Sequence, residues 1–237
     1  MKVTLLGTGA IYSKSNCAGI LLDDDTLVDV GPGVVKYLIR EKYDLSQIDT
    51  IVLTHLHFDH ISDIPLLLVY LNEMKMKHRI TIYGPRGTEE KIKDLTRLIN
   101  CRYTDRFIRD YAEFVVFGNE SVFDVHKHNF EAFEVIHGYI EAYGFIVDSK
   151  LGISGDSSLC ENVKHMVRNC DTSICDSSFE VGDHHHMGID NMLELSGLND
   201  KATLIPTHYR DEVREKMRAM DIPGNIKIVD DGFSFKI

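Results

Sequence analysis

Histidine and aspartate side chains crowd into one short segment. His55, His57, Asp59 and His60 fall within six positions, directly after the apolar run Thr50–Leu53. Imidazole nitrogen and carboxylate oxygen are the ligands that borderline divalent metals prefer, and hydrolytic sites combine them with an open position for water. On an irregular loop, the first two histidines can point one way while the other two residues serve a second centre. A polar loop with chance histidines is disfavoured at this density, so the segment predicts a metal site.

Further candidate ligands stand singly along the rest of the chain, at His137, Asp156 and His208. Each one alone has a structural explanation. The first ends an apolar run, the second follows a glycine as a turn-capping residue does, and the third could cap the helix expected after it. Because all three occur in a characteristic order along the chain, the set favours metal ligands over three separate structural residues.

The pattern His-x-His-x-Asp-His after a hydrophobic strand resembles the metal-binding signature of the metallo-β-lactamase superfamily. The other segments typical of that superfamily follow in order, as Val28-Asp29-Val30-Gly31, Val135-Ile136-His137, Ser154-Gly155-Asp156 and Ile205-Pro206-Thr207-His208. In the superfamily the aspartate of the first of these segments braces the metal loop. The resemblance covers nearly the whole chain.

The resemblance implies two divalent metal ions. The first would be held by His55, His57 and His137. The second would be held by Asp59, His60 and His208, with Asp156 bridging the pair. Zinc is the first choice, and manganese or iron suits the same ligands. A water between two cations is acidified enough to supply hydroxide near neutral pH, so we expect a hydrolase in which Asp59 counts among the catalytic residues.

Within the superfamily, the chain resembles the phosphodiesterase branch that includes ribonuclease Z, the tRNA 3′-processing endonuclease. The segments that carry this resemblance are Ile82-Tyr83-Gly84-Pro85-Arg86-Gly87, Ala142-Tyr143-Gly144-Phe145 and the run from Cys170 to Asp176. The extra histidine of that branch matches His186, which would lie beside the scissile phosphate and protonate the leaving oxygen. A general acid contributes roughly 10²–10⁴-fold to a rate.

Other histidines keep more than one interpretation. His184 and His185 can belong to a solvated loop, and a role for either stays open. His126 and His128 would share one face of a strand, and an exposed pair without function is the favoured interpretation.

The chain departs from ribonuclease Z in one respect. Those enzymes insert a flexible, basic arm that grips tRNA, whereas His137 and Asp156 are joined here by a short hairpin-like stretch. We therefore expect a small phosphodiester such as a cyclic nucleotide as the substrate, and nucleic acid is disfavoured. The alternatives are a carboxyl-type hydrolase acting on a lactone, thioester or amide, a tRNA 3′-processing endonuclease, and a metal-dependent sensor without turnover.

Strands and helices must alternate to position these residues. We expect strands at Val3–Leu6, Gly19–Leu22, Leu27–Asp29, Thr50–Leu53, Ile80–Tyr83, Phe114–Phe117, Phe130–Ile136, Ala142–Val147, Gly152–Ser154, Ser173–Cys175, Thr203–Ile205 and Ile226–Val229. We expect helices at Val34–Glu41, Asp59–Lys75, Glu89–Ile99, Leu159–Val167, Ile189–Leu195 and Glu212–Met220. With the resemblance, this predicts an α/β fold in a single domain of residues 1–237. That fold is the metallo-β-lactamase fold, a four-layer αβ/βα sandwich of two mixed sheets with outer helices.

Composition and charge limit the expected binding partners and cellular location of the protein. The 37 acidic against 26 basic residues give a net charge of −11, which repels polyanions and anionic membranes. The longest apolar run, Ile64–Leu71, is too short to span a bilayer, and Met1–Gly7 is typical of a strand rather than a secretory signal. Five cysteines without a Cys-x-x-Cys pair suit reduced thiols in a cytoplasm. The sequence leaves a monomer and a homodimer open.

Overall fold

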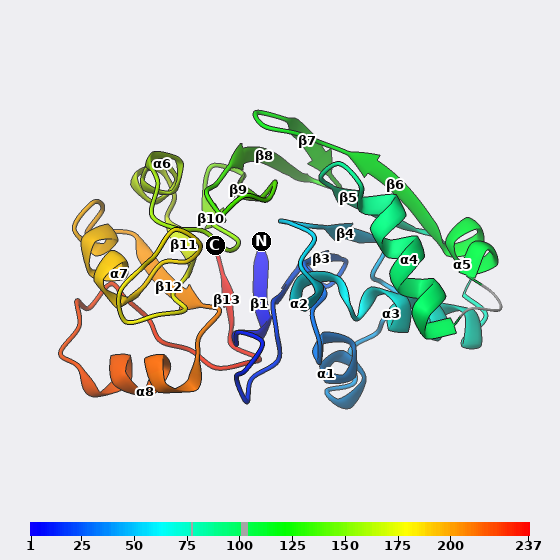
Figure 1. The fold of residues 1–237 in the computed structure, drawn as a ribbon, viewed down its shortest axis with the longest axis horizontal. Helices are drawn as coiled ribbons and strands as arrows, with labels where there is room; N and C mark the ends of the chain where they lie inside the picture. Colours follow the sequence, from blue (N-terminus) through cyan, green and yellow to red (C-terminus); the bar gives the residue numbers. More distant parts are fainter. Residues whose placement is uncertain (77, 101–103) are drawn as a thin grey trace.

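Two β-sheets face each other, and helices cover their outer sides (Figure 1). The computed structural model describes residues 1–76, 78–100 and 104–237. The first sheet has the strand order β13-β1-β2-β3-β4-β5-β6. Its strands are β1 (Lys2–Gly7), β2 (Gly19–Leu22), β3 (Thr26–Val28), β4 (Thr50–Val52), β5 (Ile80–Gly84), β6 (Ala112–Val116) and β13 (Ser234–Lys236). The run from β3 to β6 is parallel and the remaining pairs are antiparallel, so the sheet is mixed.

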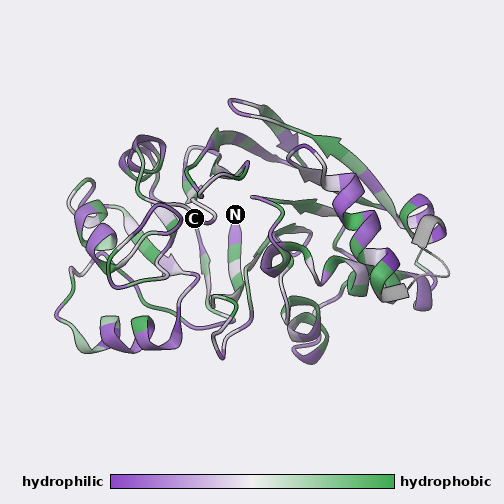
Figure 2. Cartoon of the chain, viewed as in Figure 1, coloured by the Kyte–Doolittle hydropathy of each residue, from purple (hydrophilic) through white to green (hydrophobic). Residues whose placement is uncertain are grey.

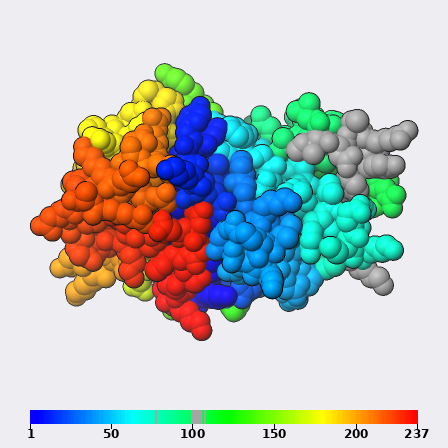
Figure 3. All heavy atoms as spheres, turned by 90° about the horizontal axis from the view of Figure 1, so that it is seen from below, coloured from blue at the N-terminus to red at the C-terminus, as the bar shows by residue number. Residues whose placement is uncertain are grey.

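The second sheet has the order β12-β11-β10-β9-β8-β7. Its strands are β7 (Val122–Val125), β8 (His128–Glu134), β9 (Tyr143–Val147), β10 (Leu151–Ile153), β11 (Thr172–Asp176) and β12 (Thr203–Thr207). The three strands β10, β11 and β12 are parallel, whereas β7 to β10 form an antiparallel meander. Figure 3 shows how the N-terminal residues in blue lie between the cyan half of the chain and the orange and red half.

The helices fall into two groups. The first sheet is covered by α1 (Val34–Arg40), α2 (Phe58–Ile61), α3 (Ile64–Glu73), α4 (Thr88–Asn100) and α5 (Thr104–Tyr111). The second sheet is covered by α6 (Glu161–Asn169), α7 (Ile189–Ser196) and α8 (Asp211–Ala219). Hydrophilic and hydrophobic residues alternate along α4 (Figure 2), as expected for a helix with one buried face.

Three hydrophobic clusters fill the spaces between these layers. One lies between the first sheet and its helices, one between the two sheets, and one between the second sheet and its helices. Successive side chains of a strand point to opposite faces. Accordingly, Leu5 and Val52 belong to the middle cluster, while their neighbours Leu6 and Ile51 belong to the outer one. The predicted four-layer sandwich of two mixed sheets is therefore confirmed.

One predicted helix is wrong. The run expected from Asp59 to Lys75 is two helices, α2 and α3, separated by a turn at residues 62–63. The Asp63 carboxylate accepts hydrogen bonds from the backbone N–H groups of Gly33 (3.1 Å) and Val35 (3.0 Å). The turn therefore satisfies backbone donors at the start of α1. Pro65 opens the new helix, where its missing N–H group costs nothing.

The strand expected at Ile226–Val229 is also wrong. Of this segment only Ile226 forms an isolated bridge, to Leu204, and the first sheet is instead completed by β13. The helix α5 and the strand β7 were not expected from the sequence.

Across the described residues, no helix combines the length and apolarity needed to cross a membrane.

The interpretation of His126 and His128 as an exposed pair on one strand is wrong as well. The first residue lies in the β7–β8 turn with φ of 53°, and the second begins β8 and is buried. Nδ1 of His128 lies 2.6 Å from Asp148 and Nε2 lies 2.8 Å from Asp23. This second carboxylate belongs to the turn after β2, so the contact joins the two sheets.

Candidate metal centre

Four of the predicted ligands come from the loop after β4 and the short helix α2. His55 and His57 lie in the loop, and Asp59 and His60 lie in the helix. His55, Asp59 and His60 are buried, whereas His57 is exposed at the edge of the cluster. The helix is held in place by a hydrogen bond of 2.7 Å from the Val30 backbone N–H to the His60 carbonyl.

The other three predicted ligands follow three different strands of the second sheet. His137 comes after β8, Asp156 after β10 and His208 after β12, and all three are buried. Because β10 and β12 are both parallel to β11, their carboxyl ends lie at one edge of the sheet. Ligands of open α/β sheets bind at such an edge.

The structure brings these residues into two groups. Ligand atoms of His55, His57 and His137 lie within 4.8 Å of one another, and so do those of Asp59, His60, Asp156 and His208. Between Nε2 of His137 and Nδ1 of His57 the distance is 3.1 Å. These groups coincide with the two ligand sets that the resemblance implies.

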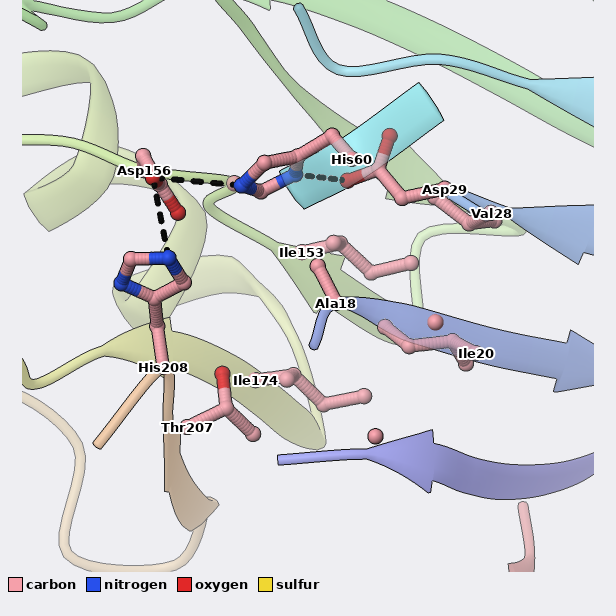
Figure 4. A pocket seen from close by; sticks show the side chains of 13 residues that line it. Ala18, Ile20, Val28, Asp29, His60, Ile153, Asp156, Ile174, Thr207 and His208 are labelled. Atoms are coloured by element: carbon pink, nitrogen blue, oxygen red, sulfur yellow. Dashed lines mark hydrogen bonds and ion pairs between the residues drawn. The ribbon is translucent and has the colours of Figure 1, made fainter. Parts of the chain in front are cut away.

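Asp156 lies between the two groups. Its Oδ2 atom is 3.2 Å from Nε2 of His60 and 3.3 Å from Nε2 of His208. The same oxygen is 3.9 Å from Nε2 of both His55 and His137. Figure 4 shows Asp156 between His60 and His208, where these side chains line one end of a cavity of about 40 Å³. One carboxylate thus faces ligands of both groups.

A carboxylate from the first sheet fixes the orientation of two histidines. Asp29, just after β3, accepts hydrogen bonds from Nδ1 of His60 (2.8 Å) and from the Thr54 hydroxyl (2.8 Å). That hydroxyl lies 3.0 Å from Nδ1 of His55 and accepts its hydrogen, because its own hydrogen is already given to Asp29. In their neutral form, both rings therefore leave Nε2 without a hydrogen, which is the form that binds a metal.

The second sheet supplies an equivalent support. Ser178 donates its hydroxyl hydrogen to Asp176 at 2.7 Å and lies 2.8 Å from Nδ1 of His208. Nδ1 of His137 donates to the backbone carbonyl of His185 at 2.7 Å. A carbonyl only accepts, so this ring also leaves Nε2 without a hydrogen.

These supports leave unmet hydrogen-bonding capacity where a metal would sit. Nε2 of His55 and Nε2 of His60 are buried and make no hydrogen bond to any described residue. Four aspartates are buried around them, namely Asp29, Asp59, Asp156 and Asp176. Burying so many carboxylates is costly unless cations compensate them. The residues present therefore fit divalent metal ions.

Local charge acts in the same direction at His55 and Asp156, whereas at His60 burial would lower the pKa but the carboxylates of Asp156 and Asp29 outweigh it and raise that pKa well above its ordinary value. Burial, reinforced by nearby His60, holds the pKa of His55 well below its ordinary value, so that ring stays neutral. Burial alone would raise the pKa of Asp156, but the imidazoles of His208 and His60 outweigh it and hold that pKa well below its ordinary value. A neutral imidazole and an ionised carboxylate are the forms that ligate metals.

Two of these residues adopt a left-handed backbone. Asp29 has φ of 59° and His208 has φ of 56°, a region in which residues other than glycine are uncommon. Both stand directly after a strand, and the sharp turn aims each side chain across the strand ends. Gly31 shows a related constraint, because a Cβ atom there would lie 1.9 Å from the Asp59 carbonyl oxygen.

His186 lies against both ligand groups. Its ring centroid is 4.7 Å from that of His137 and 5.2 Å from that of His208, and its side chain is 18% exposed. Its Nδ1 atom lies 2.8 Å from Oδ2 of Asp176. Burial would lower the pKa of His186, but the hydrogen bond and charge of Asp176 outweigh it and raise that pKa to about 9.

Asp176 and Ser178 are the members of the site that sequence reasoning missed. Asp176 ends the buried strand β11 and pairs in register with Thr207, next to His208. An aspartate directly after the predicted strand Ser173–Cys175 was the signal available in the sequence. His184 and His185 are the two histidines of this loop whose role stayed open. His184 is exposed, and its ring centroid lies 3.8 Å from that of His185.

Comparisons with known proteins agree with this geometry. The chain is 30% identical over 158 residues to ribonuclease Z of Listeria welshimeri, a match covering 63% of the chain. The chain spans about half the length of the curated relatives it matches (50% and 47% for the first two).

Solved structures show the same fold. The metallo-β-lactamase fold protein YhfI of Bacillus subtilis matches with a TM-score of 0.80 at 21% identity, over 99% of this chain and 98% of that one. A diphosphatase of the PhnP family matches with a TM-score of 0.79 at 20% identity, over 100% and 97% of the two chains. The predicted metallo-β-lactamase fold and ribonuclease Z-like branch are thus confirmed, and these names agree with the predicted hydrolase class. Residues 1–232 match the family described as Anti-Pycsar protein Apyc1, and the chain belongs to that family.

Proposed function

We propose that this chain is a dinuclear metal-dependent phosphodiesterase that hydrolyses small phosphodiesters such as cyclic nucleotides. The observation that carries the proposal is the position of His186, beside both ligand groups and anchored by Asp176. The names of the relatives support it, because a ribonuclease and a diphosphatase both cleave phosphorus–oxygen bonds. We propose that one domain of residues 1–237 holds the complete site.

The proposed ligands divide as the structure groups them. His55, His57 and His137 would hold one ion, and Asp59, His60 and His208 the other, with Asp156 facing both. When bound, two divalent cations acidify water and neutralise charge on a phosphoryl oxygen. Zinc is proposed for both positions, because imidazoles predominate among the ligands and zinc favours them.

The chain's own side chains handle the leaving group. Asp176 holds Nδ1 of His186, which fixes the ring and leaves Nε2 as the atom that carries the mobile proton. We assign this Nε2–H to the leaving oxygen of the phosphodiester. Asp59, whose carboxylate lies 3.2 Å from Nε2 of His208, is the second catalytic candidate.

The segment between His137 and Asp156 supports a small substrate. It consists mainly of the hairpin β9–β10, in which Val147 pairs directly with Leu151, and it contains no inserted arm. The net charge of −11 also opposes binding of a long polyanion.

A cytoplasmic location is proposed from the cysteines, since Cys17, Cys160, Cys170 and Cys175 are free thiols and Cys101 lies outside the described residues.

The test is a substrate panel on protein of measured metal content. We expect two metal ions per chain by elemental analysis, and turnover of 3′,5′-cyclic nucleotides and bis(p-nitrophenyl) phosphate. Precursor tRNA should be a poor substrate. Turnover of a thioester or lactone without any phosphodiester activity would replace the proposal by a carboxyl-type hydrolase. Efficient, site-selective cleavage of precursor tRNA at physiological salt would overturn the assignment of a small substrate.

A further inference from the structure

The loop after β5 lies beside the loop that carries the first ligands. β4 and β5 are parallel neighbours, with Val52 opposite Tyr83, so their carboxyl ends reach the same edge of the sheet. The loop after β4 leads to His55 and His57, and the turn after β5 holds Pro85 and Arg86. Segments at such an edge commonly bind different parts of one ligand.

A hollow of about 320 Å³ opens between these two loops and residues 140–141, which precede β9. His57 forms the end nearest the metal centre, and its walls are the apolar side chains of Leu56, Pro85 and Ile140. Small-molecule sites begin at about 300 Å³ and combine apolar walls with a few polar groups. The hollow therefore has the size and walls to take part of a small substrate.

Two cations and one carboxylate complete the lining, namely Arg86, Lys91 and Glu141. Arg86 differs from every other arginine in the described ranges, because it makes no ion pair, hydrogen bond or ring contact there. Lys91 likewise forms no ion pair with a described residue. The Glu141 carboxylate is held by a hydrogen bond of 2.8 Å from the Tyr143 hydroxyl. The rim thus offers free donors and a positioned acceptor.

The backbone beneath Arg86 is fixed. The Thr88 hydroxyl donates to the Pro85 carbonyl at 2.7 Å, and the Thr88 backbone N–H donates to the same oxygen at 3.3 Å. Gly84 packs so closely that a Cβ atom there would lie 2.2 Å from the Thr88 hydroxyl oxygen. The guanidinium therefore starts from a rigid turn, although its own side chain is exposed.

We propose that this hollow binds the heterocyclic base of a nucleotide substrate, while the phosphodiester lies at the metal centre. This inference rests on the proposed function. The apolar walls suit the faces of a flat ring, Arg86 and Lys91 donate to its oxygen and nitrogen acceptors, and Glu141 accepts from an amino or imino group. A second phosphate is a poorer occupant, because Glu141 would repel it and the apolar walls would not solvate it.

The first test compares substrates with and without a base. In Arg86→Ala, kcat/KM for 3′,5′-cyclic nucleotides should fall by about 10- to 100-fold more than kcat/KM for bis(p-nitrophenyl) phosphate, mainly through KM. Arg168→Ala, an exposed arginine on α6, is the matched control and should change neither value. Metal content should equal that of the wild type. An equal loss on both substrates, or no loss on either, would overturn the assignment of a base.

The second test does not depend on turnover. By titration calorimetry, the metal-loaded wild type should bind adenosine 5′-monophosphate about 10-fold or more tightly than ribose 5-phosphate, and Arg86→Ala should abolish that difference. Equal binding of the two ligands by the wild type would refute the base site even if cyclic nucleotides are hydrolysed. A wild type that hydrolyses no phosphodiester but shows the calorimetric difference would remove the proposed function and keep the base site.

Discussion

The two halves of the molecule contribute to the candidate metal centre in different ways. The first half supplies four candidate ligands from positions 55 to 60, in one loop and the short helix α2. The second half supplies three candidate ligands, each from the loop after a different strand. The first set can form from local geometry, whereas the second exists only when the six-stranded sheet is assembled. The proposed dinuclear site therefore depends on the packing of one half against the other.

The largest effect should come from Asp156, because its carboxylate faces ligands of both groups. Asp156→Ala should lose metal at both positions and lower kcat by about 10³-fold or more, since metal-ion catalysis contributes several kcal/mol. His208→Ala should reduce metal content chiefly at one position. Elemental analysis and turnover of bis(p-nitrophenyl) phosphate measure both effects, with the exposed Asp221→Ala as control. Unchanged metal content in Asp156→Ala would contradict the shared-ligand arrangement.

The next effect separates catalysis from metal binding within the second half. His186→Ala should keep both metals and lower kcat by roughly 10²–10⁴-fold on substrates with a poor leaving group. The loss should be much smaller for a nitrophenolate leaving group, which needs little protonation. Equal losses on both kinds of substrate would indicate that this histidine binds the phosphate. Loss of metal in the variant would make it a ligand.

Metal removal tests whether the cluster holds the halves together. At free metal 1,000-fold above Kd, each bound ion adds about 4 kcal/mol to the free energy of unfolding, so two ions add about 8 kcal/mol, or roughly 20 °C in Tm for a chain of this size. Dialysis against a chelator should lower Tm by this amount, and zinc should restore it. In His208→Ala the drop should be smaller. The same Tm with and without chelator would show that the halves are held by packing alone.

The smallest effect comes from a link between the sheets away from the metal centre. Burial would raise the pKa of Asp23, but hydrogen bonds from Lys127, the Lys2 backbone N–H and His128 outweigh it and hold that pKa well below its ordinary value. Asp23→Asn should lower the free energy of unfolding by about 1–2 kcal/mol at pH 7. Urea denaturation measures it, with Asp124→Asn as control.

The sign of its pH dependence follows from the lowered pKa. The stabilisation by Asp23 is fully present above the unfolded-state pKa, near 4, and is lost as the pH falls through the folded-state pKa. The difference between wild type and Asp23→Asn should therefore be constant from pH 5 to 7 and shrink below about pH 4. A difference that grew on acidification would contradict this role.

Much of this arrangement could be predicted from the sequence because its signals are local. Apolar runs marked most strands, and the spacing of His55 to His60 marked the metal loop. What could not be predicted depends on long-range contacts. The helix breaks before Pro65 because Asp63 accepts hydrogen bonds from backbone N–H groups at the start of α1. The strand β13 pairs with β1, at the other end of the chain. Asp176 was missed because its role depends on its contact with His186, ten residues later in the chain, which forms only in the folded protein.

The Pro85–Thr88 turn has a consequence for how such a protein diversifies. None of the proposed metal ligands lies in this turn, and Thr88 rather than the metal cluster fixes its backbone. Sequence changes at the exposed side chains of Arg86 and Lys91 can therefore accumulate without disturbing the metal centre. Selection can therefore alter substrate contacts on the β5–α4 side of the hollow, whereas Leu56 and His57 on its other side belong to the loop of the proposed metal ligands.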